Sequence, residues 1–159
     1  MRAIFLILCS VLLNGCLGMP ESVKPVSDFE LNNYLGKWYE VARLDHSFEK
    51  GLSQVTAEYR VRNDGGISVL NRGYSEEKGE WKEAEGKAYF VNGSTDGYLK
   101  VSFFGPFYGS YVVFELDREN YSYAFVSGPN TEYLWLLSRT PTVERGILDK
   151  FIEMSKERG

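Results

Sequence analysis

The chain has 159 residues, a length that suits one domain with a sizeable hydrophobic core. Its 18 basic and 22 acidic side chains give a formal net charge of −4, which argues against nucleic-acid binding because the basic residues form no run. The only cysteines are Cys9 and Cys16, so loss of an N-terminal signal that contains Cys9 would leave no internal disulfide.

The N-terminus has the features of a secretory signal. Met1-Arg2 precedes an apolar run from Ala3 to Leu13, which is shorter than the roughly 20 residues of a membrane-spanning helix. The stretch Leu13-Asn14-Gly15-Cys16 resembles a bacterial lipobox, in which the signal is cut before the cysteine and the cysteine is acylated. We therefore expect residues 1–15 to be a signal peptide and Cys16 to carry lipid. An ordinary signal peptide that happens to contain a cysteine is the alternative.

The residues after Cys16 predict where the protein is held. Leu17 stands where an aspartate would retain a lipoprotein in the inner membrane, so we expect a lipid-anchored protein of the outer membrane with its domain in the periplasm. Residues 16–26 contain Pro20 and Pro25 among polar side chains and are predicted to form a tether. The folded domain is then expected to cover residues 27–159.

A short helical turn and a C-terminal helix are predicted before and after a long region of strands. Ser27 and Glu30 fit a capping box and predict a helical turn that ends before Gly36. At the other end, Thr140-Pro141 predicts the start of an amphipathic helix, whose apolar stripe is Val143, Ile147, Phe151 and Met154. We expect this helix to pack on the strands, and a membrane-surface role is the alternative.

Between these elements the chain alternates in the manner of β-strands, and turn signals recur at spacings of roughly 10 to 15 residues. The predicted strands are 37–44, 54–62, 66–74, 81–90, 98–104, 110–117, 121–127 and 133–139. Such a meander abolishes its exposed edges by closing into an eight-stranded antiparallel up-and-down β-barrel. The predicted fold is therefore all-β, with a short N-terminal helical turn and a C-terminal α-helix.

Strand direction brings distant residues to one end of this barrel. Gly36 and Trp38 open the first strand, Asp117 and Tyr121 flank the turn after the sixth, and Arg139 follows the eighth. A guanidinium over an indole face contributes roughly 0.5–2 kcal/mol. We therefore predict a sealed floor, built from these five residues.

The same residues carry a family resemblance. Gly36-x-Trp38, Asp117 to Tyr121 and Arg139 resemble, in order, the three signature regions of the lipocalins. With the lipobox, the chain resembles the outer-membrane lipoproteins among the bacterial lipocalins. The resemblance implies a carrier of fatty acids or lysophospholipids. It also implies a short strand after the C-terminal helix, which we expect to lie beyond Gly159; a protein that lacks this strand is the alternative.

Alternation from Trp38 and Arg139 predicts which side chains line a ligand cavity above the floor. Small residues on this face leave room, and polar-tipped aromatics could meet a head group. A barrel filled by its own side chains is the alternative, and a single bulge would invert a strand. The predicted ligand-binding residues are Glu40, Ala42, Ala57, Tyr59, Asn71, Val101, Phe103, Val112, Phe114, Tyr133 and Trp135.

Catalytic residues are scarce. His46 is the only histidine, so we expect no catalytic residues, no metal site and no cofactor. An inward Glu40 would be either a neutral buried acid or the partner of an inward cation. Phe104, Phe107 and Tyr108 make one rim apolar, which suits membrane or partner contact, and a locally packed hairpin tip is the alternative. Partner contact there gives a second hypothesis, an interaction module that includes a homodimer. An enzyme on the barrel scaffold is a weaker third hypothesis.

Overall fold

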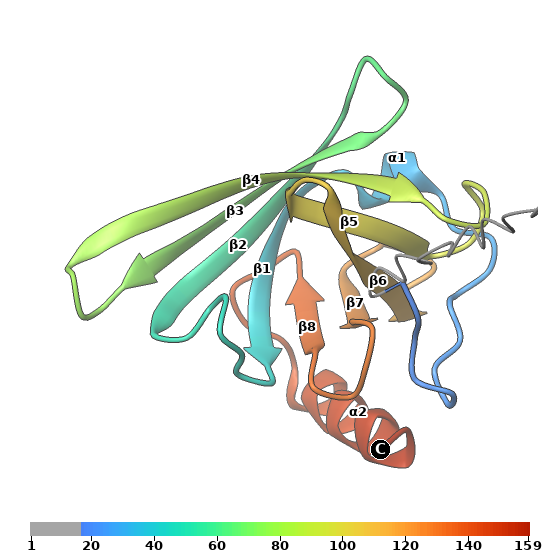
Figure 1. Ribbon diagram of the computed structural model, residues 1–159. Coiled ribbons are helices and arrows are strands. Elements are labelled where there is room, and N and C mark those ends of the chain that lie inside the picture. Colours follow the sequence, from blue (N-terminus) through green and yellow to red (C-terminus); the bar gives the residue numbers. More distant parts are fainter. Residues whose placement is uncertain (1–16) are drawn as a thin grey trace, which may run out of the picture.

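The computed structural model describes residues 17–159, so the predicted signal peptide and Cys16 lie outside the described residues. It contains the predicted closed barrel of eight antiparallel strands paired in sequence order (Figure 1). The strands are β1 (Gly36–Arg43), β2 (Leu52–Val61), β3 (Ile67–Ser75), β4 (Glu80–Phe90), β5 (Tyr98–Phe104), β6 (Phe107–Leu116), β7 (Tyr123–Ser127) and β8 (Leu134–Ser138). The barrel closes because β1 pairs with both β2 and β8.

The N-terminal helix α1 (Leu31–Tyr34) begins later than the capping box predicts. Glu30 occupies its N-cap position and makes no side-chain cap. Phe29 is 3% exposed, and its backbone N–H donates to the carbonyl of Thr95 at 2.8 Å. The residues before α1 are therefore held against the barrel, and Ser27 does not start the helix.

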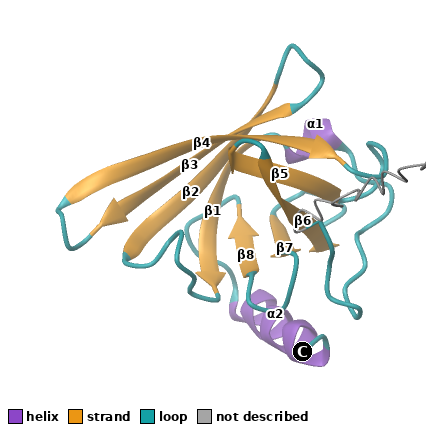
Figure 2. Cartoon of the chain, in the orientation of Figure 1, coloured by secondary structure: helices purple, strands orange, loops and turns teal. Residues whose placement is uncertain are grey.

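The C-terminal helix α2 (Arg145–Glu157) lies on the outside of the barrel (Figure 2). It also begins later than predicted, after Glu144, because the Thr140 hydroxyl donates to the carbonyl of Thr142 at 2.7 Å within a turn. Its predicted apolar stripe packs on the barrel wall as expected. Within residues 17–159 no helix is long and apolar enough to cross a membrane.

Apolar side chains form two groups on opposite sides of the sheet. The inner core fills the closed part of the barrel and includes Trp38, Tyr59, Val69, Ala88, Leu99 and Leu137. The outer core lies between the barrel wall and α2 and includes Val112, Phe114, Phe125, Leu136 and Phe151.

A bulge on β1 changes which side chains of this strand face inward. The register against β8 shifts between Glu40 and Ala42. Ala42 therefore pairs with Leu136 and packs in the outer core. The prediction that Ala42 lines the cavity is wrong, and the inward position passes to Arg43, which pairs with Trp135.

A second bulge has the same effect on β6, where the register against β7 shifts between Val113 and Glu115. Val112 and Phe114 consequently belong to the outer core, so the prediction that they line the cavity is also wrong. Tyr111 and Val113 pack with the inner core instead. An extra residue in one strand reverses the alternation beyond it.

The described part of the predicted tether, residues 17–26, is packed against the barrel. Val23 is 6% exposed and belongs to the outer core. The N–H of Val26 donates to the carbonyl of Val113 at 2.9 Å, and the carbonyl of Val26 accepts from Gly97 at 2.9 Å. This segment is a strap along the wall, because its apolar side chains and backbone groups find partners there.

The closed end contains the five residues predicted for the floor. The Arg139 guanidinium lies 3.8 Å from the ring centroid of Trp38, which is fully buried. Gly36 has a φ of 94°, and a side chain added there would face an Arg139 nitrogen at 3.6 Å. The Asp117 carboxylate accepts hydrogen bonds from the turn that ends at Tyr121.

Arg139 also donates to backbone carbonyls from separate segments. Its partners are Asn33 at 2.8 Å, Lys37 at 2.9 Å, Leu35 at 3.0 Å and Tyr121 at 3.2 Å. The Trp38 indole N–H donates to the Tyr34 carbonyl at 2.8 Å. These bonds attach α1 across the end of the barrel.

We expect Trp38→Ala to lower the free energy of unfolding by roughly 3–5 kcal/mol, because it leaves a large cavity and removes the face that Arg139 covers. Urea unfolding monitored by circular dichroism measures this. Trp81→Ala is the control, since Trp81 is 44% exposed and should change stability much less. Equal effects of the two substitutions would contradict the assignment of Trp38 to the floor.

Candidate functional site

The interior above the floor contains most of the residues predicted to line it. Ala57 and Asn71 are directly paired on β2 and β3, so they share the inward face. Val101 and Phe103 pack against the inner core, as does Trp135. Tyr133 stacks on Trp135 with ring centroids 6.2 Å apart.

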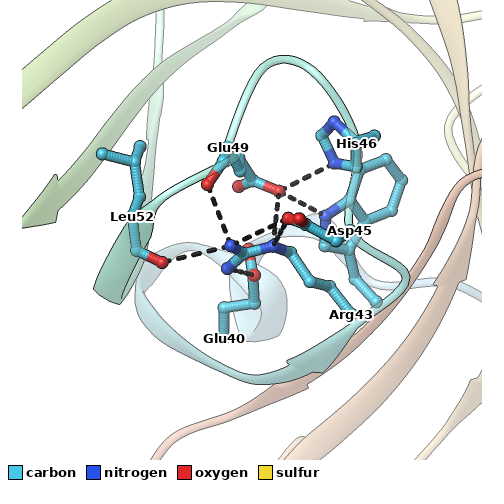
Figure 3. Close-up of polar contacts among 7 residues, drawn as sticks. Glu40, Arg43, Asp45, His46, Glu49 and Leu52 are labelled. Carbon is cyan, nitrogen blue, oxygen red and sulfur yellow. Dashed lines mark hydrogen bonds and ion pairs between the residues drawn. The ribbon is translucent and has the colours of Figure 1, made fainter. Parts of the chain in front are cut away.

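A group of polar side chains lies toward the open end, where β1 ends. We call Glu40, Arg43, Asp45, His46, Glu49 and Trp135 the mouth cluster (Figure 3). Arg43 is at its centre and donates to Glu40 at 3.0 Å and to Asp45 at 3.2 Å. It also donates to the backbone carbonyls of Glu49 at 2.9 Å and Leu52 at 3.1 Å. One guanidinium thereby fastens the β1–β2 loop to the inside of the barrel.

Glu49 holds the other half of the mouth cluster. Its carboxylate accepts a hydrogen bond from the Trp135 indole N–H at 3.0 Å, and it lies 2.8 Å from Nε2 of His46. The His46 ring contacts the rings of Phe48, Tyr133 and Trp135 at centroid distances of 5.6, 5.2 and 5.3 Å. The loop is therefore anchored by aromatic contacts as well as by charge.

Glu40 is a buried acid in this cluster, with a side chain 6% exposed. Burial, followed by the nearby Glu49 carboxylate, raises the pKa of Glu40 from 4.5 to about 8, and Arg43 only partly opposes this. Glu40 is thus mainly protonated at neutral pH. The two alternatives expected for an inward Glu40 were a neutral buried acid and the partner of a cation. The raised pKa favours the neutral form, and the side chain also contacts the Arg43 guanidinium.

Sequence reasoning missed several residues of the interior. Simple alternation placed Arg43 and Tyr111 outward, because it did not include the bulges on β1 and β6. Tyr34 reaches the interior from α1, which strand alternation does not describe. A usable signal for Arg43 was its position three residues after a buried acid that needs a cation.

The contacts of the mouth cluster hold the β1–β2 loop in place. Among residues 17–159 no group of three or more His, Cys, Asp or Glu side chains is arranged to hold a metal ion. Arg43 donates to Glu40 and to the loop carbonyls, and the Trp135 indole N–H donates to Glu49. The arrangement is suited to shaping the entrance of a cavity.

We expect the free energy of unfolding to fall as pH rises from about 4.5 to about 8, and Glu40→Gln to remove much of this slope. Unfolded Glu40 loses its proton near 4.5, whereas the folded protein keeps it up to about 8, so the folded state binds more protons in this window. Urea titrations at several pH values measure the slope. Glu77→Gln, on an exposed side chain, is the control. Parallel slopes for wild type and Glu40→Gln would contradict the burial of Glu40.

Comparisons with known proteins agree with this architecture. The sequence profile of the lipocalin-like domain matches residues 29–159. Insecticyanin from the tobacco hornworm Manduca sexta superposes with a TM-score of 0.70 at 24% sequence identity, over 89% of this chain and 82% of that chain. This similarity concerns the fold alone.

Curated bacterial relatives are much closer in sequence. The outer membrane lipoprotein Blc of Vibrio cholerae serotype O1 is 99% identical over 159 residues, which is 100% of this chain and 93% of the relative. The protein of the same name from Escherichia coli K12 is 51% identical over 140 residues, which is 88% of this chain and 78% of the relative. The chain belongs to the lipocalin family, among its bacterial outer membrane lipoproteins.

Proposed function

We propose that the protein is an anchored carrier that holds a fatty acid or lysophospholipid in its barrel, within the bacterial envelope. The observation that carries this proposal is a closed lipocalin barrel whose inner face includes small apolar residues such as Ala57 and Ala88. Arg139 and Trp38 close the floor, while the mouth cluster shapes the opposite end. A carrier needs this asymmetry, because the ligand is shielded from water yet can leave.

The pairing between β4 and β5 ends before either strand does. β3 and β4 stay paired out to Ser75 and Glu80, but β4 and β5 pair only as far as Lys87 and Ser102. The outer half of β4 therefore leaves its neighbour, and Figure 1 shows β2, β3 and β4 flaring away from the shorter strands.

The lining suits an acyl chain. Ala57 and Ala88 are small inward residues, and Leu99 and Val101 add apolar surface. Burial of apolar surface contributes roughly 25 cal/mol per Å², so a long chain gains several kcal/mol in such a lining. The head group would remain near Trp135 and Tyr133, beside the mouth cluster.

The second candidate function is an interaction module, with a second copy of the chain as one partner. It is favoured by Phe104 and Phe107, which are 72% and 76% exposed at the tip of the β5–β6 hairpin. An exposed pair of phenylalanines indicates contact with an apolar surface. The family comparison supports a binding role over an enzymatic one.

We expect delipidated protein to bind a fluorescent fatty acid saturably, and Asn71→Trp to weaken binding by about tenfold or more, because a large ring at this half-buried inward position fills the cavity. Fluorescence titration measures both affinities.

Leu70→Trp is the matched control, since Leu70 is the adjacent β3 residue and faces the other side of the sheet. It should bind like wild type. Absence of saturable binding by wild type, together with a dimer in sedimentation, would replace the carrier with the interaction module.

For the anchor, which lies outside the described residues, we expect Cys16→Ser to release the protein from membranes, because the acylated thiol is lost. Fractionation of cell envelopes followed by immunoblotting measures this. Wild-type protein should remain in the outer membrane fraction. A Cys16→Ser protein that stays there would rule out the lipid anchor.

A further inference from the structure

Exposed aromatic side chains gather at the end of the barrel opposite the floor. The tip of the β5–β6 hairpin carries the largely exposed Phe104 and Phe107. The β1–β2 loop carries Phe48, which is 69% exposed, and Trp81 is exposed at the start of β4. We call these four residues the aromatic rim. Among residues 17–159, every exposed phenylalanine or tryptophan belongs to it.

Strand direction explains why the aromatic rim lies at one end. β1 leaves the floor at Trp38, so the connections after β1, β3 and β5 of this up-and-down barrel lie at the opposite end. The connections at the floor end are residues 62–66, 91–97 and 117–122, and they contain no phenylalanine or tryptophan. Exposed aromatic surface is therefore confined to one end of the described protein.

The β5–β6 hairpin tip is the most apolar part of the aromatic rim. Phe104 and Phe107 are direct cross-strand partners, so their rings stand on the same face of the hairpin. Gly105 and Pro106 between them are exposed and uncharged. Phe103 packs against the inner core, so alternation turns Phe104 away from the barrel. Two large apolar side chains are thus left in water, which favours contact with an apolar partner.

The loops of the aromatic rim combine apolar and charged residues. Lys50 follows Phe48 closely, and Glu77 and Lys78 lie in the turn that precedes Trp81. Aromatic residues flanked by charged ones are typical of side chains that enter the boundary between lipid head groups and acyl chains. The chain belongs to bacterial outer membrane lipoproteins, so a bilayer is an apolar partner that is present where the protein is located.

Charge and area narrow the choice of partner. Residues 45–50 and 76–80 contain more acids than lysines, so the aromatic rim offers no basic patch for an anionic surface. A stable dimer buries roughly 800 Å² on each partner with good shape complementarity. The rim consists of single rings on three separate connections, and a bilayer accepts each ring on its own.

We propose that the aromatic rim docks the protein on a lipid bilayer with zwitterionic head groups, and that Phe104 and Phe107 enter it. This contact is additional to the lipid anchor. It turns the end that carries the mouth cluster toward the bilayer. A lipid then passes between bilayer and barrel without crossing water, a consequence that rests on the proposed carrier function.

Vesicle binding by the chain from residue 17 onward tests this surface without the anchor. This chain contains every strand of the closed barrel and both apolar cores. Vesicles of phosphatidylcholine and phosphatidylethanolamine are sedimented, and the protein that sediments with them gives a partition coefficient. We expect wild type to bind at low and at high salt, because salt screens attraction between charges and leaves apolar contact intact.

The variant Phe104→Ser/Phe107→Ser should lower the partition coefficient about tenfold or more, because two rings no longer leave water. The matched control is Val61→Ser/Val91→Ser, which changes two exposed apolar side chains at the floor end. It should bind vesicles like wild type. All four positions are exposed, and thermal unfolding followed by circular dichroism checks that both variants keep the fold.

Titration with a fluorescent fatty acid in solution separates docking from lipid binding. Wild type and Phe104→Ser/Phe107→Ser should have equal affinities, because both phenylalanines point into solvent. Failure of both proteins to bind the acid would refute the carrier function, and vesicle binding would still decide on the docking surface.

Two results would overturn the proposal. One is a wild type that does not sediment with vesicles, or a Phe104→Ser/Phe107→Ser variant that binds them as well as wild type does. The other is a wild-type dimer that this variant abolishes, seen by analytical ultracentrifugation without any vesicle binding. That second result would assign the aromatic rim to a second copy of the chain.

Discussion

The contact between Arg139 and Trp38 is the constraint on which the rest of the structure depends. A lysine could not replace this arginine, because only a planar guanidinium covers an indole face while it donates in several directions. Its carbonyl partners lie at the end of α1, at the start of β1 and before β7. A single side chain thus joins three segments that are distant in sequence.

The two ends of the barrel use their polar groups differently. At the closed end, Arg139 donates to backbone carbonyls, and the Tyr34 hydroxyl lies 2.6 Å from the Tyr111 hydroxyl. At the open end, Arg43 satisfies loop carbonyls and stands among acids. Each arginine fastens a short segment across an end of the barrel. Arg43 contacts the carboxylates of Glu40 and Asp45 and lies near that of Glu49, so pH acts on the entrance.

The barrel and its floor could be predicted because they depend on regularities that sequence displays. Hairpin turns set strand direction, and direction alone brings Trp38 and Arg139 to the same end. The predicted lining was correct where alternation is unbroken, as at Ala57 and Tyr59 on β2. It failed at Ala42, which follows the register shift of β1, and at Phe114, which lies within the register shift of β6.

Bulges are poorly marked in sequence because they need no particular residue type. This is why the mouth cluster could be only half predicted. Glu40 precedes the bulge of β1 and was placed inward, whereas its partner Arg43 follows the bulge. Tyr34 was missed for another reason, since a one-turn helix that plugs a barrel has no periodicity of its own.

The strap formed by residues 17–26 limits how the domain can move at a bilayer. The Tyr98 hydroxyl donates to the carbonyl of Leu17, and the Ser22 hydroxyl donates to the carbonyl of Arg158 at 2.8 Å. A lipid on Cys16 would therefore be attached one residue away from a fixed point on the wall. The segment between the lipid and the domain would be very short, so the domain would rotate very little relative to its anchor. Its orientation to the membrane plane would then be a property of the fold and not of a random chain.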